Sequence, residues 1–296
     1  MKTNLTVVFA VMAVIFAPSL GRASTIAQET FEGYTLGLLN GQGGAGGGWS
    51  GPWGAPGAAT RADVVSASMT YTVPGGGTFS GAANALEVQL LTGQTGNQIT
   101  GARQLSSSLG ETFYVGYMAR VVTSTINGTN SEWAGGNNTF ALHLGTNSSS
   151  TTTLNFGLRG GAVDEFMIRY ATGTPVAGAS TGGNLVNDTD YYLVAQVNWD
   201  SGLSAFTTAR MWLNPTVSDN VDTPLGDAAL DFADFANPIT HLFWRQAALQ
   251  NDDILRADNL ILGTSWADVV PVPEPVSIAL LGLGALAVVA SRRRRC

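Results

Sequence analysis

The chain of 296 residues has almost no cysteine, lysine or histidine. Its single cysteine, Cys296, is the last residue, so no disulfide can form within the chain, even in an oxidising compartment. Lys2 is the only lysine, and His143 and His241 are the only histidines. A catalytic triad or a zinc site needs histidine beside suitable partners, and these two lie on separate predicted strands. We therefore interpret both histidines as structural or surface residues.

The first 23 residues have the composition of a secretory signal peptide. Lys2 supplies a positive charge, residues 5–16 form an apolar run, and Gly21 and Ala23 supply small residues near a cleavage site. The apolar run is about a dozen residues long, whereas a helix that crosses a bilayer needs about 20. We therefore expect signal peptidase to cut after Ala23, which leaves a body of residues 24–268.

The other end of the chain, residues 269–296, joins three signals in series. A proline-rich segment precedes an uncharged apolar stretch at residues 276–290, and an arginine cluster follows at residues 292–295. The stretch predicts a short transmembrane helix, and the arginines favour its cytoplasmic side. The prolines cannot continue a helix, so they hold an extended segment outside the bilayer. The residues that carry these signals are Val272, Pro273, Glu274, Pro275, Arg292, Arg293, Arg294 and Arg295.

This tail resembles the PEP-CTERM sorting motif, which a membrane processing enzyme called exosortase recognises and cuts. The resemblance implies an exported protein that is transiently held at the inner membrane and then reaches the cell surface or the extracellular space. An ordinary tail anchor is the alternative, but it would need no Pro-Glu-Pro segment. The likeness covers residues 271–296 and implies a destination, not an activity.

Without its two ends, the body carries charge mainly of one sign. It has 8 arginines and 20 acidic residues, so its net charge is 8 − 20 = −12, and it has no lysine. Such a surface repels nucleic acid, because affinity for nucleic acid comes largely from cationic contacts with phosphate. It is compatible with the binding of cations or neutral glycans.

The body predicts β-strands, because short runs alternate apolar and polar residues between polar turns. The predicted strands include residues 113–121, 140–144, 154–158, 166–170, 191–199, 209–213, 241–244 and 255–262. Arg159 and Arg169 fall on the face opposite to the apolar residues of their strands. Residues 227–235 predict a short helical turn at the rim, and residues 41–57 predict a loop. About ten strands and 37 glycines indicate one all-β domain, an antiparallel two-sheet jelly-roll sandwich.

Three short segments also resemble concanavalin A-like and laminin-G-like jelly-roll domains. They are residues 29–34, residues 199–200 together with 212–215, and residues 258–266. In that fold the first and last strands lie together, which implies that Glu29 lies in the region of Asp258. The resemblance transfers no catalytic residue.

The acidic residues do not form a recognisable catalytic pattern. Many enzymes of this fold place acids as Glu-x-Asp-x-x-Glu on one strand, and this sequence has no such run. Asp164 and Glu165 are adjacent and would face opposite sides of a strand, and Asp188 and Asp190 lie in a predicted turn. We therefore predict solvated turn acids, no catalytic residue and no enzymatic activity.

Two kinds of binding site remain open. Glu29 and Asp258 are candidate ligands for a structural calcium ion that ties the terminal strands, although both could instead cap turns or pair with Arg256. Trp49, Trp53 and Trp133 lie in Gly-rich or Asn-rich segments and are candidate glycan contacts, exposed or packed inward. For the strand tryptophans, Trp199, Trp212 and Trp244, we predict core positions.

Three functions fit these observations. The leading hypothesis is a non-enzymatic cell-surface or extracellular-matrix protein that acts in adhesion or exopolysaccharide organisation. A carbohydrate-binding module of the same fold is the alternative, and exposed aromatic side chains on one concave face would favour it. A polysaccharide hydrolase is the third, and two carboxylates that face one another in a cleft would favour it. The expected partners are signal peptidase, exosortase and a surface polysaccharide.

Overall fold

The computed structural model describes thirteen stretches of the chain. They are residues 24–43, 47–54, 60–81, 83–90, 97–123, 139–148, 151–159, 165–172, 174–180, 185–219, 228–235, 238–247 and 253–270. The predicted signal peptide, the sorting tail from Pro271 onward, Trp133 and Asp164 lie outside the described residues.

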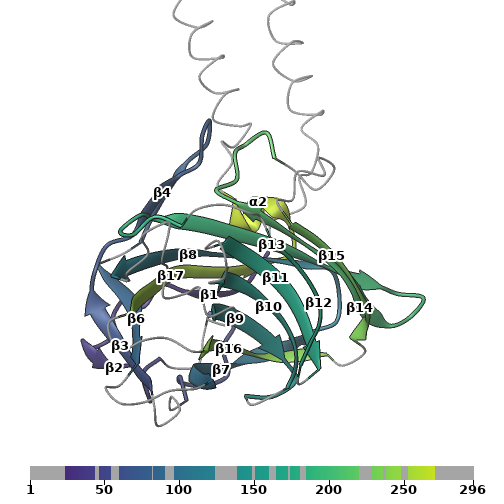
Figure 1. Ribbon diagram of the computed structural model, residues 1–296, viewed down its shortest axis with the longest axis horizontal. Coiled ribbons are helices and arrows are strands. Elements are labelled where there is room, and N and C mark those ends of the chain that lie inside the picture. Colours follow the sequence, from purple (N-terminus) through teal and green to yellow (C-terminus); the bar gives the residue numbers. More distant parts are fainter. Residues whose placement is uncertain are drawn as a thin grey trace, which may run out of the picture.

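The described residues form two antiparallel sheets (Figure 1). The strands of the larger sheet are β1 (Thr25–Glu29), β2 (Gly37–Leu38), β3 (Thr60–Ser66), β6 (Asn84–Leu90), β8 (Phe113–Thr123), β13 (Tyr191–Asp200), β14 (Ala205–Leu213), β15 (Ala228–Phe235) and β17 (Ile254–Gly263). Their order is β15-β14-β13-β8-β17-β6-β3-β2, and β1 pairs with β17.

The smaller sheet has six strands in the order β12-β11-β10-β9-β16-β7. Their bounds are β7 (Asn97–Leu109), β9 (Thr139–Gly145), β10 (Thr152–Arg159), β11 (Glu165–Thr172), β12 (Thr174–Ser180) and β16 (Ile239–Ala247). A separate hairpin of β4 (Thr70–Thr72) and β5 (Thr78–Ser80) and the short helix α2 (Trp266–Val269) complete the described elements. This architecture confirms the predicted antiparallel sandwich.

Apolar side chains from alternate strand positions fill the space between the two sheets. Leu142 on β9, Phe156 on β10 and Ile168 on β11 are neighbours in register, and all three are fully buried. Trp244 on β16 stacks on Phe140, with ring centroids 5.3 Å apart. Since alternate residues of a strand point to opposite faces, the residues between these positions point out of the sandwich.

The outward face of the larger sheet is covered by the β4–β5 hairpin and α2. Tyr71 and Phe79 of the hairpin stack on Tyr192 of β13, with centroids 5.5 Å and 4.4 Å apart. Trp266 of α2 meets Trp212 of β14 edge to face at 5.0 Å. These contacts form a second apolar cluster outside the main core. They confirm the core position predicted for Trp212.

The first and last strands lie side by side, as the jelly-roll resemblance implied. β1 pairs with β17 in antiparallel register, and Glu29 is opposite Leu260. At the end of β1, Glu29 forms a buried ion pair with Arg103 of β7, with side chains 4% and 3% exposed. Because β1 belongs to the larger sheet and β7 to the smaller, this ion pair joins the two sheets.

One predicted element is wrong, since residues 228–235 form strand β15 rather than a helical turn. β15 pairs with β14, where Leu230 is opposite Ala209 and Phe235 is opposite Phe206. A register shift between these two pairs moves Phe235 back to the buried face. The spacing of the apolar residues therefore reflects a bulged strand, which a short segment does not distinguish from a helical turn.

We predict that Arg103→Met destabilises the protein by about 3–5 kcal/mol, because it leaves the Glu29 carboxylate buried without its cation. The control is Arg159→Met, which removes a side chain that is 45% exposed and pairs with Glu165 at 3.5 Å. Such exposed pairs contribute about 0–1 kcal/mol. Chemical denaturation of the mature exported protein measures both changes, and equal losses in the two variants would contradict a dominant role for the buried pair.

Candidate functional site

The Glu29 carboxylate is occupied by protein donors and does not fit a metal ligand. Its Oε1 accepts the backbone N–H of Phe31 at 2.9 Å. Its Oε2 accepts from the Tyr34 hydroxyl at 2.6 Å, from Trp53 Nε1 at 3.0 Å and from Arg103 Nη1. With a guanidinium and three further donors around it, this carboxylate is already neutralised and has no need of a cation.

Asp258, the second residue of the expected calcium pair, lies buried on β17 with one oxygen unpartnered. Its Oδ1 accepts the backbone N–H of Asn259 at 2.6 Å, and its Oδ2 has no hydrogen-bond partner. A Cβ atom at Gly81 would lie 2.0 Å from that Oδ2, so only glycine fits there. Burial, with smaller contributions from the carboxylates of Glu32, Glu29 and Asp190, raises the pKa of Asp258 to about 8.

These contacts do not favour the predicted calcium site. Asp258 offers one free carboxylate oxygen, whereas calcium takes six to eight oxygen ligands. Within the described part of the chain, no group of three or more His, Cys, Asp or Glu side chains could hold a metal ion. Arg256 does not form the alternative pair with Asp258, since it donates to Glu87 at 2.8 Å.

Two of the candidate glycan contacts are buried, which overturns an exposed aromatic platform at these positions. Trp49 is 2% exposed and its Nε1 donates to the Gln28 carbonyl at 2.8 Å. Trp53 is 1% exposed and donates to Glu29. The Arg103 guanidinium lies over both rings, 4.8 Å and 5.9 Å from their centroids. The third candidate, Trp133, lies outside the described residues.

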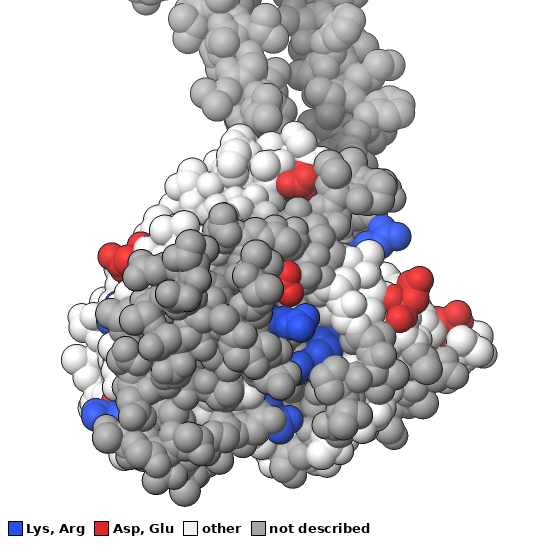
Figure 2. Space-filling view, in the orientation of Figure 1, with Lys and Arg blue, Asp and Glu red and all other residues white. Residues whose placement is uncertain are grey.

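The outward face of the smaller sheet carries polar and charged side chains, and we call it the polar face. Its charged and hydrogen-bonding members lie on four neighbouring strands, at positions that alternate with core residues. They are His143 on β9, Thr153, Asn155 and Arg159 on β10, Glu165 and Arg169 on β11, and His241 and Arg245 on β16. Figure 2 shows arginine surface near the middle of the view, where Figure 1 places β10 and β11.

A chain of hydrogen bonds crosses the polar face. Arg169 Nε donates to Asn155 Oδ1 at 3.2 Å, and Asn155 Nδ2 donates to Thr153 Oγ1 at 3.4 Å. The same hydroxyl oxygen lies 3.2 Å from His143 Nδ1. His143 is 2% exposed, its ring stacks on Phe243 at 5.1 Å, and its Nε2 has no hydrogen-bond partner.

Positive charge dominates this face. Burial lowers the pKa of Arg169, and the guanidinium groups of Arg159 and Arg245 lower it further. Burial, with Arg245 and Arg169 nearby, also holds the pKa of His143 well below its usual value, so this histidine is neutral at pH 7. The acid on this face, Glu165, pairs with Arg159 at 3.5 Å at the end of the strands.

The turn acids divide into an exposed and a paired residue. Asp188 has a side chain 72% exposed, in accord with a solvated turn acid. Asp190 is only 14% exposed and pairs with Arg120 at 2.6 Å, so the prediction of a solvated acid was wrong for this residue.

His241 lies on the strand next to that of His143, and its Nδ1 lies 2.8 Å from Thr240 Oγ1. None of these contacts joins two carboxylates.

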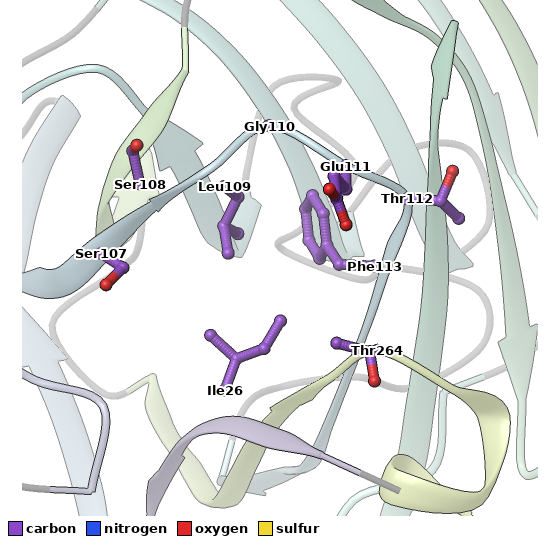
Figure 3. A pocket seen from close by; sticks show the side chains of 9 residues that line it. All are labelled: Ile26, Ser107, Ser108, Leu109, Gly110, Glu111, Thr112, Phe113 and Thr264. Atoms are coloured by element: carbon purple, nitrogen blue, oxygen red, sulfur yellow. The ribbon is translucent and has the colours of Figure 1, made fainter. Parts of the chain in front are cut away.

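A cavity of about 420 Å³ opens at the turn between β7 and β8 (Figure 3). Figure 3 shows Ile26, Leu109 and Phe113 pointing toward its centre. Glu111 is the one titratable group among the lining residues, which also include Thr264. A lone carboxylate cannot supply the paired acid and base that glycoside hydrolysis needs, so the cavity carries no candidate chemistry of that kind.

The chain carries the PEP-CTERM protein-sorting motif at residues 271–295, as a family model for this motif matches them. The match confirms the predicted resemblance and indicates export and sorting to the cell surface, and exosortase recognises this motif. Among the described residues, no helix has the length and apolarity that a membrane crossing requires, and the predicted helix at residues 276–290 lies outside them. A comparison with curated proteins finds no similar sequence.

Solved structures of similar fold include proteins that act on or bind polysaccharides. Domain 4 of AbnA, an extracellular arabinanase from Geobacillus stearothermophilus, in complex with arabinotriose, is 10% identical over 86% of this chain and 97% of its own, with a TM-score of 0.46. The cellulose induced protein Cip1 is 16% identical over 79% and 95%, with a TM-score of 0.42. The alginate lyase Aly36B is 15% identical over 66% and 92%, with a TM-score of 0.41. At these values the likeness gives no evidence of a shared ligand.

The polar face was only partly visible in the sequence. The alternation on β10 and β11 placed Arg159 and Arg169 opposite the core, but it gave no sign that Arg245 lies on the same face. Arg245 is opposite Ala141 of β9, a pairing that spans more than 100 residues of sequence. The signal that could have found it is the alternation of His241, Phe243 and Arg245 with Leu242 and Trp244.

The free energy of unfolding of the wild type should fall as pH rises from about 4 to about 8, and we predict that Asp258→Asn removes this fall. In this window the folded state keeps Asp258 protonated, because its pKa is raised to about 8, whereas the unfolded state ionises it above 3.8. The folded state therefore binds more protons, and its stability falls as pH rises, by up to about 1.4 kcal/mol per pH unit.

The measurement is the free energy of unfolding against pH, in a buffer with a metal chelator, as the difference between variant and wild type. The matched control is Asp200→Asn in an exposed turn, where the amide can still accept the N–H of Gly202. The same pH profile in the wild type and Asp258→Asn would show that this carboxyl is ionised in the folded protein.

Proposed function

We propose that this chain is an exported, non-enzymatic protein of the cell surface or extracellular matrix, and that its sandwich acts in adhesion or in the organisation of exopolysaccharide. The sorting motif at residues 271–295 is the observation that carries the proposal, because it indicates export and sorting to the cell surface. The route includes cleavage by signal peptidase, passage through the inner membrane and cleavage by exosortase.

The placement of the acidic residues supports a role without catalysis. Hydrolysis of a glycosidic bond needs two carboxyl groups about 5–5.5 Å apart for retention or about 6.5–9.5 Å apart for inversion. Among the described residues of the polar face, Glu165 is the one carboxylate, and it pairs with Arg159. The cavity beside β7 likewise contributes Glu111 alone.

A carbohydrate-binding module is the second candidate, and the contrast between the two outward sheet faces favours it. The β4–β5 hairpin and α2 cover apolar residues on the larger sheet, whereas the outward face of the smaller sheet carries buried and half-buried polar side chains. Since Trp49 and Trp53 are buried, binding on the described residues would depend on hydrogen bonds and charge rather than on stacking against these two rings.

We predict that replacing Pro273, Glu274 and Pro275 by alanine leaves export intact but retains the protein at the inner membrane, because exosortase then has no motif to cut. The control is Cys296→Ser, which lies outside the matched residues 271–295. Cell fractionation shows where each variant is, and mass spectrometry of the recovered protein reads both termini.

The expected mature wild-type chain begins near Ser24 and ends near the Pro-Glu-Pro segment. Normal amounts of the triple-alanine variant outside the cell would refute the sorting route. A surface protein that still carries Arg292 to Cys296 would instead identify a membrane-retained protein.

We also predict that the recovered protein does not cleave polysaccharides. Incubation with alginate, pectate, arabinan and cellulose should produce neither new reducing ends nor unsaturated sugars. Chain cleavage of any of them would overturn the non-enzymatic part of the proposal while leaving the sorting route in place.

A further inference from the structure

The cavity at the turn between β7 and β8 lies beside an irregular part of β7. Two pairs of residues fix the register of β7 on β16, and between them β7 advances by 109 − 104 = 5 residues whereas β16 advances by 241 − 239 = 2. Residues 105–108 therefore bulge out of the ladder with β16. Ser107 and Ser108 in this bulge are exposed and line the cavity.

A second bulge lies on β1. Ile26 falls between Thr25, which is opposite Gly263, and Ala27, which is opposite Leu262, so it has no partner of its own on β17. Figure 3 shows its side chain pointing into the cavity from the side opposite β7. Bulges redirect side chains and are frequent beside functional sites, so two of them at one cavity indicate a shaped wall rather than a gap between regular strands.

Hydroxyl groups and one carboxylate surround the opening of this cavity. Ser107, Ser108, Glu111 and Thr264 are all exposed. Within the described part of the chain, their side chains make no hydrogen bond or ion pair. A hydroxyl both donates and accepts, and a carboxylate accepts, so these groups can form hydrogen bonds with a ligand that itself carries hydroxyls.

The backbone around the opening is held in place by hydrogen bonds. Thr112 Oγ1, next to Glu111, accepts the backbone N–H of Trp199 at 3.0 Å, which ties the turn between β7 and β8 to β13. The backbone N–H of Thr264 donates to the Ser24 carbonyl at 3.3 Å, beside the start of β1. A site whose groups are already positioned loses less conformational entropy when it binds a ligand.

Charge and size restrict the ligand. Glu111 is the one titratable group among the lining residues, so the wall carries a negative charge, and the whole body has a net charge of −12. An acidic ligand would therefore be repelled. The volume of about 420 Å³ falls within the range of about 300–1,000 Å³ that is common for small-ligand sites. A sugar ring, which combines hydroxyls with an apolar face of C–H groups, fits both restrictions.

We propose that this cavity binds one sugar unit of a non-acidic glycan. Glu111 accepts hydrogen bonds from the sugar hydroxyls, and Ile26 contacts the apolar face of the ring. The hydroxyls of Ser107, Ser108 and Thr264 complete the contacts. Because hydrogen bonds to a charged acceptor are about twice as strong as those between neutral groups, Glu111 contributes most. This inference rests on the proposed function, and it names the ligand class and the site for the role in exopolysaccharide organisation.

The test is a calorimetric titration of the mature protein recovered from cells. The probes are four neutral disaccharides, namely maltose, cellobiose, lactose and diacetylchitobiose, and one acidic disaccharide, digalacturonate. For one sugar unit in an open cavity we expect a dissociation constant of about 1 mM, so each titration extends to about 20 mM. We expect at least one neutral disaccharide to bind, and to bind about tenfold or more tightly than digalacturonate.

Variants locate the site. We expect Glu111→Ala to weaken binding of the preferred disaccharide about tenfold or more. Glu111→Gln keeps an acceptor but loses the charge, so it should bind digalacturonate better than the wild type does. Thr264→Val removes one hydroxyl at nearly constant shape and should weaken binding about threefold.

The matched control is Asp231→Ala, which removes an exposed carboxylate from β15 at the far edge of the larger sheet and should bind like the wild type. Thermal unfolding checks the fold of each variant. Since Glu111 has no partner among the described residues, Glu111→Ala should keep the melting temperature of the wild type.

The outcomes distinguish this inference from the proposed function. Absence of saturable binding for all four neutral disaccharides, a preference for digalacturonate, or unchanged binding in folded Glu111→Ala overturns the sugar site but leaves an exported non-enzymatic protein. An equal loss in Asp231→Ala also overturns it, because the effect would then come from overall charge. Sugar binding by a protein that cell fractionation finds only inside the cell supports the site and contradicts the proposed function.

Discussion

The buried ion pair between Glu29 and Arg103 links the two sheets, and several other features depend on it. Arg103 comes from the smaller sheet and Glu29 from the first strand of the larger, so the pair holds the terminal strands against the sandwich. A buried charge pair is tolerable only when further hydrogen bonds complete it, and Tyr34 and Trp53 provide them. The same arrangement keeps Trp53 buried and occupies the Glu29 carboxylate with protein donors.

The two outward faces of the sandwich differ in what covers them. On the larger sheet, the hairpin and α2 bury Tyr192 and Trp212, so that face is already used for stability. On the smaller sheet, the alternation that sends Phe156 and Ile168 into the core sends Asn155 and Arg169 outward. The same period-two pattern therefore stabilises the fold on one side and arranges hydrogen-bond donors on the other.

The sequence predicted the strands with strong alternation and the meeting of the first and last strands, but not the long strand β7. Residues 97–109 are rich in Gln and Ser, so their apolar period is weak, and their position depends on pairing with β16. The burial of Trp49 and Trp53 also depends on a distant partner, Arg103. The local pattern predicts which face of a strand is buried. It does not predict the register between distant strands, and this register brings the residues of the site together.

Net charge and local charge lead to different expectations for the ligand. The body total of −12 favours a neutral glycan or a cation, because it describes the field far from the surface. At physiological ionic strength that field is screened beyond about 8 Å, so a group in contact with the polar face responds mainly to Arg169, Arg245 and their neighbours. The acidic remainder then works against loose, non-specific attachment of polyanions elsewhere on the molecule. The sum of all charges therefore describes the molecule at long range and does not describe the polar face.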